Sequence, residues 1–305
     1  MQYLIEIPSP RGHQRFIGAL IDTITESSDE PVCLVTYASH RAAIPNASKA
    51  GFIALGDDLP NREGKLRRKF RITRGLMRVI RLRLRGRILF LSYDPWVFLL
   101  LHFWRRPVEV IEHNNVDRAE SSVVYRVIYQ LLPAHVTHLC FESYIAHHVA
   151  TRYGKQTATI DFPRSKPGTH FAPVIGGRPF YFAPTVCEDV ETVRAAAIQL
   201  HSRNYLLLLR APVGREVEYE NLSSNVRLLV EPLDYDALFA AAAGIAVLNE
   251  YHYRVSAVFF EALASGKPCL FRDCLFSREA AARYGESAIR ILFSAERGDH
   301  ETEHR

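Results

Sequence analysis

The residues best suited to binding a charged ligand lie between Tyr253 and Pro268, in the sequence Tyr253-Arg-Val-Ser-Ala-Val-Phe-Phe-Glu-Ala-Leu-Ala-Ser-Gly-Lys-Pro268. The pattern predicts a helix that carries Glu261 near its C-terminal end and stops at Gly266, before Pro268 begins a buried strand. A strand at 244–248 and a short loop precede this helix, so its N-terminus opens at the carboxyl edge of a sheet. Free backbone N–H groups and a partial positive charge at such an end suit a phosphate.

This segment resembles the nucleotide-sugar motif of GT-B glycosyltransferases, especially the large retaining family (family 4, or group 1) whose signature is Glu-x7-Glu followed by Ala-[Leu/Met]-Ala-x-Gly-x-Pro. The resemblance is loose over the whole chain and close at 225–275. It implies that Glu261 binds the ribose hydroxyls of the nucleotide, and that Ser256, which replaces a glycine of the family, bonds the diphosphate. Tyr253 occupies the position of the first glutamate, which contacts the transferred sugar, and Glu250 is close enough to substitute for it. The same string is also compatible with an ordinary helix C-cap entering a strand.

A second polar cluster, Glu112-His113-Asn114-Asn115, follows a buried strand and precedes a helix. Related glycosyltransferases often have a histidine here that contacts the donor sugar, so the resemblance implies a catalytic role for His113. The alternative is that the cluster caps the next helix through an Asn or through Asp117.

The loop after the first strand, which contains Gly12 and His13, faces the acceptor in GT-B enzymes, so the resemblance places these two residues on the acceptor side. A solvated loop with a capping role is the alternative. The family also has an Arg and a Lys that neutralise the leaving diphosphate, which would be the main catalytic effect. Their usual pattern is missing, and the candidates are Arg210, at the end of a Leu-rich strand, and Arg254. Both could instead be ordinary surface charges.

Asp234-Tyr235-Asp236 matches an Asp-x-Asp metal motif, but it opens an Ala-rich helix, where acidic residues cap the helix and favour its dipole. We expect capping here, and no other cluster has metal-ligand spacing. We therefore expect no required metal and no cofactor, only a nucleotide-diphosphate sugar as the donor substrate.

Apolar strand-like runs alternate with helical patterns along the whole chain, which predicts parallel sheets with helices on both faces. Four prolines and three glycines at 161–179 indicate a linker. The predicted fold is α/β, with two Rossmann-like doubly wound domains facing a cleft, the GT-B arrangement. The predicted domains are an N-terminal acceptor domain at 1–165 and a C-terminal nucleotide-sugar-binding domain at 166–305.

Residues 65–87 contain eleven Lys and Arg and no acidic residue, whereas the rest of the chain has 27 basic and 33 acidic residues, a balance of −6. In this segment Leu66, Phe70, Met77, Ile80 and Leu84 recur at helical spacing. An arginine-rich amphipathic helix favours an anionic membrane surface, and the apolar run 96–104 adds to it. The alternative is a helix packed on the core with solvated arginines. No nucleic-acid partner is expected, because no recognised fold accompanies the charge.

The composition, 48% hydrophobic and 23% charged, is that of a globular protein rather than a disordered chain. We expect no signal peptide and no membrane-spanning helix. The five scattered cysteines indicate buried, reduced thiols. These features predict a cytoplasmic protein that associates peripherally with the inner or plasma membrane.

The resemblance implies a glycosyltransferase of the hexosyltransferase kind that moves a sugar from a nucleotide-diphosphate donor to a lipid-linked or polysaccharide acceptor. A sugar-nucleotide epimerase of the same fold is a second possibility. A third is a non-catalytic GT-B-like subunit that binds a partner glycosyltransferase or the membrane, which the missing first glutamate favours.

Overall fold

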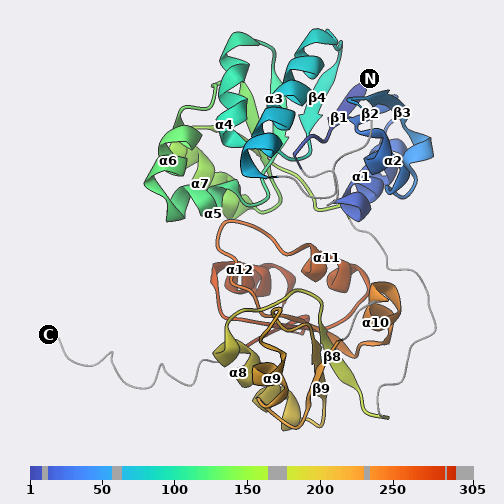
Figure 1. The fold of residues 1–305 in the computed structure, drawn as a ribbon, viewed down its shortest axis with the longest axis vertical. Coiled ribbons are helices and arrows are strands. Elements are labelled where there is room, and N and C mark those ends of the chain that lie inside the picture. The colour runs from blue at the N-terminus through green and yellow to red at the C-terminus, as the bar shows by residue number, and fades with distance from the viewer. Residues whose placement is uncertain (9–12, 57–63, 164–176, 230–233, 286, 293–305) are drawn as a thin grey trace, which may run out of the picture. The chain divides into compact units, whose positions relative to one another are not determined.

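The computed structural model describes residues 1–8, 13–56, 64–163, 177–229, 234–285 and 287–292. The chain forms two compact units (Figure 1). The first unit is Met1–Ser165 together with Tyr253–Val255, and the second is Lys166–His252 together with Ser256–Arg305. The assignment of Tyr253–Val255 to the first unit was not indicated by any sequence pattern.

The first unit contains a seven-stranded parallel sheet with the order β3-β2-β1-β4-β5-β6-β7. Chain direction across the sheet changes between β1 and β4, the switch point outside which ligands bind in open α/β sheets. Its strands are β1 (Gln2–Ile5), β2 (Val32–Thr36), β3 (Gly51–Ala54), β4 (Arg87–Phe90), β5 (Val108–Ile111), β6 (Val136–Cys140) and β7 (Gln156–Thr159).

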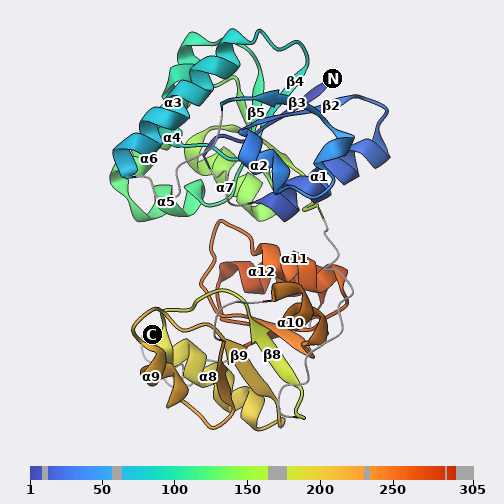
Figure 2. The same ribbon diagram turned by 45° about the vertical axis from the view of Figure 1, so that its right-hand side comes forward.

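Helices cover both faces of this sheet. Successive side chains of a strand point to opposite faces, and because both sets are apolar here, each face packs against its own helices. Tyr3 and Ile5 join a core that includes Leu76 of α3, whereas Leu4 packs with Ile17 of α1 on the other face. Figure 2 shows the two sets of helices on either side of the sheet. The helices are α1 (Gln14–Ser27), α2 (Ala38–Ala42), η1 (Ala47–Lys49), α3 (Lys65–Arg81), α4 (Pro95–Phe98), η2 (Leu99–Phe103), α5 (Asn115–Ser121), α6 (Val123–Gln130) and α7 (Ser143–Tyr153).

The second unit contains a six-stranded parallel sheet with the order β10-β9-β8-β11-β12-β13 and its switch point between β8 and β11. Its strands are β8 (Phe180–Ala183), β9 (Leu206–Leu209), β10 (Val226–Leu228), β11 (Gly244–Val247), β12 (Cys269–Phe271) and β13 (Ile289–Ile291). Its helices are α8 (Val190–His201), α9 (Glu216–Glu220), α10 (Tyr235–Ala241), α11 (Ala257–Ala264) and α12 (Leu275–Tyr284). Two parallel sheets of this kind confirm the predicted α/β, doubly wound fold.

The helical patterns at 119–132 and 96–105 each predict one continuous helix, and the structure differs in both places. The predicted helix 119–132 is two helices, α5 and α6, because Ser122 between them is extended. The predicted helix 96–105 has only one α-helical turn, α4, before it continues as the 3₁₀ helix η2.

Two further observations concern the sequence predictions. All five cysteines are free and buried, as predicted. No helix of the described residues is long and apolar enough to cross a membrane. Most of the predicted linker at 161–179 lies outside the described residues.

Candidate active site

In the first unit, polar side chains gather where three neighbouring strands end. Glu6 follows β1, Ser92 follows β4 and His113 follows β5. Glu6 is fully buried, and its Oε1 accepts a hydrogen bond from the Ser92 hydroxyl. These residues lie at the switch point of the sheet, where a doubly wound fold places its ligand. The sequence analysis did not assign Glu6 a role; the only signal was a carboxylate at the end of an otherwise apolar strand.

His113 is held as a neutral imidazole. Its Nε2 lies 2.7 Å from the Leu91 carbonyl oxygen, which can only accept, so Nε2 carries the hydrogen and Nδ1 is left as an acceptor. Burial and the adjacent His13 lower the pKa of His113 from 6.5 to about 4. At neutral pH His113 is therefore a hydrogen-bonding group for a hydroxyl rather than a cation for a phosphate.

His13 lies against His113. Their rings are stacked, with centroids 4.4 Å apart and an interplanar angle of 24°. His13 has a positive φ of 65° and makes no capping hydrogen bond with its side chain, so the capping alternative is wrong for its imidazole. Its Nδ1 is 3.7 Å from Glu6 Oε2. The structure thus brings the predicted catalytic histidine and the predicted acceptor-side histidine together, whereas Gly12 lies outside the described residues.

A buried hydrogen-bond network fixes the strand end that carries His113. Oε1 of Glu112 accepts from the hydroxyls of Tyr93 and Tyr129 and is 2.5 Å from Nδ1 of His138. Burial and the Glu112 carboxylate raise the pKa of both tyrosines, so they stay protonated donors.

The alternative in which Asn114 caps α5 is wrong, because its side chain makes no capping bond.

Tyr253 and Arg254 bind to residues of the first unit. The Tyr253 amide donates to Asp117 Oδ1 over 2.6 Å, and the tyrosine ring stacks on His148 with centroids 3.7 Å apart. Arg254 Nε lies 3.1 Å from Asp117 Oδ2. Asp117 therefore partly neutralises Arg254, which was a predicted diphosphate ligand.

His148 is in turn held by Glu120. His148 Nε2 and the Tyr153 hydroxyl contact Glu120 Oε1 at 2.7 and 2.8 Å. Burial acts to raise the pKa of Glu120, but these hydrogen bonds outweigh it and the pKa is lowered. An ionised Glu120 thus orients the imidazole on which Tyr253 stacks.

In the second unit, the motif helix α11 begins and ends as the sequence predicts. Ser256 is buried at the N-cap, and its hydroxyl accepts from the Phe259 amide over 3.4 Å. Gly266 follows the helix with φ of 65°, the left-handed conformation predicted for it. Because α11 follows β11 in this sheet, its N-terminal amides lie at the sheet's carboxyl edge, where an anion binds favourably.

Glu261 lies in the last turns of α11 and accepts a hydrogen bond from the Tyr235 hydroxyl. Tyr235 was predicted only as part of the Asp-Tyr-Asp segment, and this contact was missed because it joins α10 to α11. Asp234 caps α10 by accepting from the Ala237 amide over 3.0 Å, so the capping interpretation of that segment is confirmed. Among the described residues, no group of three or more His, Cys, Asp or Glu is placed to hold a metal ion.

Two other predicted residues lie at the same edge of the second sheet. Arg210 directly follows β9, and Glu250 follows β11 after a short stretch. Glu250 Oε1 is 2.9 Å from His252 Nε2, and its Oε2 is 3.5 Å from Arg272. Arg272 also contacts Asp189 at 3.1 Å. Arg272 is a cation at this edge that the sequence analysis missed, since no motif marks it.

Comparison with known proteins identifies the fold. No protein-family model matches the chain, and no curated protein matches it in sequence. Among solved structures, it is similar to HepE of Anabaena in complex with UDP-glucose, with a TM-score of 0.61 and 14% identity over 92% of this chain and 82% of that one. The S. aureus MnaA–UDP structure has a TM-score of 0.58 and 15% identity over 95% and 83%. WaaG, a glycosyltransferase involved in lipopolysaccharide biosynthesis, has a TM-score of 0.56 and 11% identity over 95% and 85%.

These similarities show that the chain has the GT-B fold, as the resemblance of the motif segment predicted.

Proposed function

We propose that this protein is a glycosyltransferase that moves a sugar from a nucleotide-diphosphate donor to a hydroxyl of a lipid-linked or polysaccharide acceptor. The observation that carries the proposal is the α11 segment. A buried serine caps this helix at the carboxyl edge of a doubly wound sheet, and a hydrogen-bonded glutamate lies on its last turns. Structures of this fold have been solved with UDP-glucose and with UDP, which supports a nucleotide-sugar donor.

Each donor-side residue has a role in this proposal that follows from its chemistry. The α11 amides and Ser256 bind the diphosphate, and Glu261, oriented by Tyr235, accepts hydrogen bonds from the ribose hydroxyls. Arg210 supplies positive charge for the leaving diphosphate, whereas Arg254 supplies less because it is paired with Asp117. The amides and guanidinium groups stabilise the departing charge electrostatically, so we propose that transfer needs no metal or cofactor.

The other roles belong to the first unit. His113 accepts a hydrogen bond from a sugar hydroxyl at Nδ1, because its Nε2–H is already donated to Leu91. His13, which lies beside the buried Glu6, binds the acceptor hydroxyl in this proposal. Residues 65–87 attract an anionic membrane surface, so we propose action at the cytoplasmic face of the membrane that holds a lipid-linked acceptor.

Nucleotide binding tests the proposal first. UDP, GDP, ADP and their common sugars are titrated against the protein by calorimetry, followed by the best ligand against Glu261→Ala and a matched control, Glu218→Ala. Glu218 lies on α9, away from α11, and forms an exposed ion pair with Arg215 at the start of the same helix. We expect one nucleotide to bind to the original chain. Glu261→Ala should lower the affinity for that nucleotide by about tenfold or more, and the control variant should bind it with unchanged affinity. Equal binding by both variants would remove Glu261 from the site, and absence of binding across the set would refute the proposed donor.

One observation favours a second function, a non-catalytic subunit of the same fold. Tyr253, at the position of the family's first glutamate, is engaged with Asp117 and His148. Its amide and one face of its ring are therefore occupied, and the position that holds a carboxylate in the family holds none here. A chain that binds no nucleotide but co-purifies with a partner glycosyltransferase would support this second function.

A further inference from the structure

Helix α3 presents apolar side chains in two directions. Its core side consists of Ile72, Leu76 and Val79, which are buried at i, i+4 and i+7. Leu66 and Phe70, which belong to the predicted apolar stripe, are instead 85% and 71% exposed. Packing against the sheet therefore accounts for one apolar face of α3 and leaves the other uncovered within this chain's described residues.

The uncovered apolar surface continues onto neighbouring helices of the same unit. Trp96 of α4 and Phe103 of η2 are exposed, Phe103 by 88%. On and just after α6, Val123, Val127 and Leu131 are exposed at i, i+4 and i+8, one stripe of a helix. An amphipathic helix normally turns such a stripe toward a partner.

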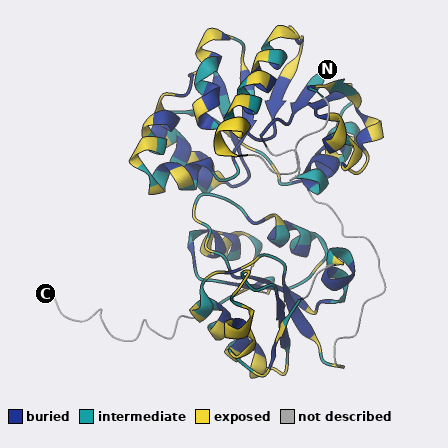
Figure 3. Ribbon diagram, viewed as in Figure 1, coloured by how far each residue is buried: buried dark blue, intermediate teal, exposed yellow. Residues whose placement is uncertain are grey.

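Contacts join these elements into one surface. Lys69 Nζ lies 4.7 Å from the centroid of the Trp96 ring, which connects α3 to α4. His102 Nε2 lies 2.8 Å from the Leu131 carbonyl oxygen, which connects η2 to the end of α6. Figure 3 shows exposed residues on α3, α4 and α6 of the first unit. We call the exposed side chains of the three α-helices α3, α4 and α6, together with those of the 3₁₀ helix η2 and Leu131, the three-helix face.

The charge of the three-helix face has one sign. No Asp or Glu occurs within α3, α4, η2 or α6, whereas α3 alone carries eight Lys and Arg. Apolar side chains among cations, with no acidic residue on the same helices, fit a surface that is anionic outside and apolar beneath, which is the construction of an anionic lipid bilayer.

We propose that the three-helix face is the membrane-docking surface of this protein, and that Phe70, Phe103 and the α6 stripe enter the lipid interface while the α3 cations bind headgroups. The proposal deepens the proposed action at a membrane and rests on it. This proposal differs from attraction of the basic segment 65–87 by charge alone. The apolar side chains of α6 lie outside that segment and add affinity because they are buried in the lipid interface.

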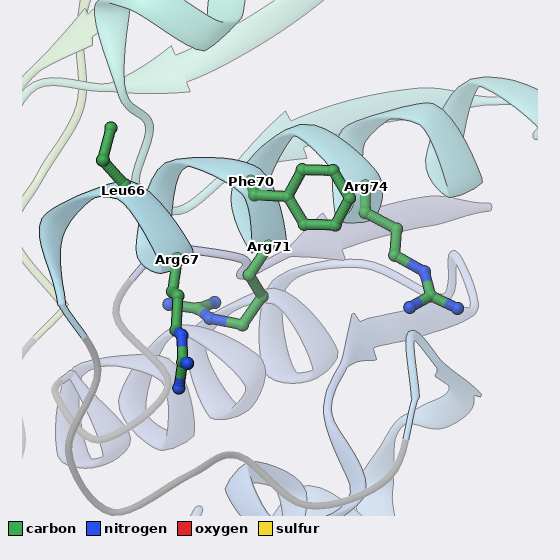
Figure 4. Close-up of a pocket in the computed structure, with 5 residues that line it drawn as sticks. All are labelled: Leu66, Arg67, Phe70, Arg71 and Arg74. Atoms are coloured by element: carbon green, nitrogen blue, oxygen red, sulfur yellow. The ribbon is translucent and has the colours of Figure 1, made fainter.

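A hollow on α3 gives the headgroup contact a defined place. A cavity of about 460 Å³ is lined by Leu66, Arg67, Phe70, Arg71 and Arg74. Figure 4 shows the Arg67 and Arg71 side chains extending to the same side of the helix, with the Phe70 ring between Arg71 and Arg74. Guanidinium groups bind phosphate oxygens well. Arg71 Nη1 already donates to the Ile7 carbonyl oxygen, so Arg67 and Arg74 are the guanidinium groups that would bind a lipid phosphate here, with Phe70 beside its chain.

Vesicle co-sedimentation tests the proposal. The full chain is mixed with vesicles of phosphatidylglycerol and phosphatidylcholine in equal parts, and with phosphatidylcholine alone. Two variants remove exposed apolar groups, Leu66→Ser/Phe70→Ser on α3 and Val123→Ser/Val127→Ser on α6. The matched control is Val213→Ser/Val217→Ser in the second unit, where both valines are also exposed, by 98% and 71%.

We expect preference for the anionic vesicles and a loss of about tenfold or more in affinity for each apolar variant, since each CH₂ leaving hydrocarbon changes affinity by about fourfold. The control should bind like the original chain. Absence of binding to anionic vesicles, or apolar variants that bind as tightly as the control, would overturn the proposal. If RNA displaces the protein from the vesicles and the apolar substitutions do not change vesicle affinity, the face is instead a general polyanion-binding surface and the proposal is overturned.

Nucleotide titration of the same variants without vesicles separates this proposal from the proposed function. If the original chain binds nucleotide normally but does not bind anionic vesicles, only the docking surface is refuted. The reverse result would refute only the donor site. Circular dichroism of each variant verifies that the chain is folded.

Discussion

At the scale of single residues, the candidate site of the first unit depends on the protonation of stacked imidazoles. His113 is neutral because desolvation and the adjacent His13 lower its pKa, and it donates Nε2–H to Leu91, which leaves one defined acceptor, Nδ1. His13 remains partly exposed, next to the buried Glu6. Two histidines in contact thus have different environments, and only the first is fixed as a hydrogen-bond acceptor.

This environment predicts a pH dependence of stability. The pKa of His113 is about 4 in the folded protein and 6.5 in the unfolded chain, so between these values the unfolded chain binds more protons. The free energy of unfolding should therefore fall as pH decreases from 6.5 to 4, with His113 contributing at most about 3 kcal/mol. Urea titrations at several pH values should show a smaller decrease for His113→Asn than for His147→Asn, an exposed histidine on α7. The same slope in both variants would contradict the burial of a neutral His113.

At the scale of elements, α11 combines a structural and a proposed binding role in one side chain. Ser256 caps the helix, and it also lies where the diphosphate is proposed to bind. Capping a helix does not require a ligand. The capping role and the proposed diphosphate-binding role of Ser256 can therefore be separated by comparison with a second capped helix. Asp94 caps α4 in the first unit in the same way, by accepting from the Trp96 amide over 3.0 Å.

We predict that Ser256→Ala and Asp94→Ala each lower the free energy of unfolding by about 1 kcal/mol, the usual loss when an N-cap is removed. Only Ser256→Ala should also lower the affinity for the nucleotide, by about tenfold, because this substitution removes a hydrogen bond to the charged diphosphate. Chemical denaturation and calorimetry measure the two quantities. Equal nucleotide affinity in both variants would restrict Ser256 to capping.

At the scale of the whole molecule, the chain is two units with separate sheets and separate cores. The predicted donor residues Glu261, Ser256, Arg210 and Glu250 all belong to the second unit, whereas His113 and His13 belong to the first. A nucleotide held chiefly by the second unit should stabilise that unit more than the first.

The two tryptophans offer a measurement of this difference, because Trp96 and Trp104 both lie in the first unit. A nucleotide at 100 times its dissociation constant stabilises its binding unit by about 2.7 kcal/mol. We expect it to shift the unfolding followed by far-UV circular dichroism more than the unfolding followed by tryptophan fluorescence. Amide hydrogen exchange should slow mostly in α11. An equal shift by both probes, with protection centred on the first unit, would place the nucleotide elsewhere.

Buried strands were predictable because their apolar runs are continuous, and α11 because its cap residues are local signals. Three strands at or near the sheet edges were not predicted: β3, β7 and β13. Edge strands are covered on fewer sides, so β3 and β7 contain many partly exposed or polar residues and show no apolar run. The break at Ser122 was missed because helical spacing continues across it.

The sequence by itself determined the α/β class, the two doubly wound halves and the caps of α10 and α11, since each follows from residues close together in the chain. Only the tertiary structure decided that Glu6, His13 and His113 lie together, that Tyr235 orients Glu261, and that Tyr253–Val255 belongs to the first unit. It also decided which apolar residues of α3 are buried. Periodicity shows that a helix has an apolar side, but contacts between distant segments decide what, if anything, covers it.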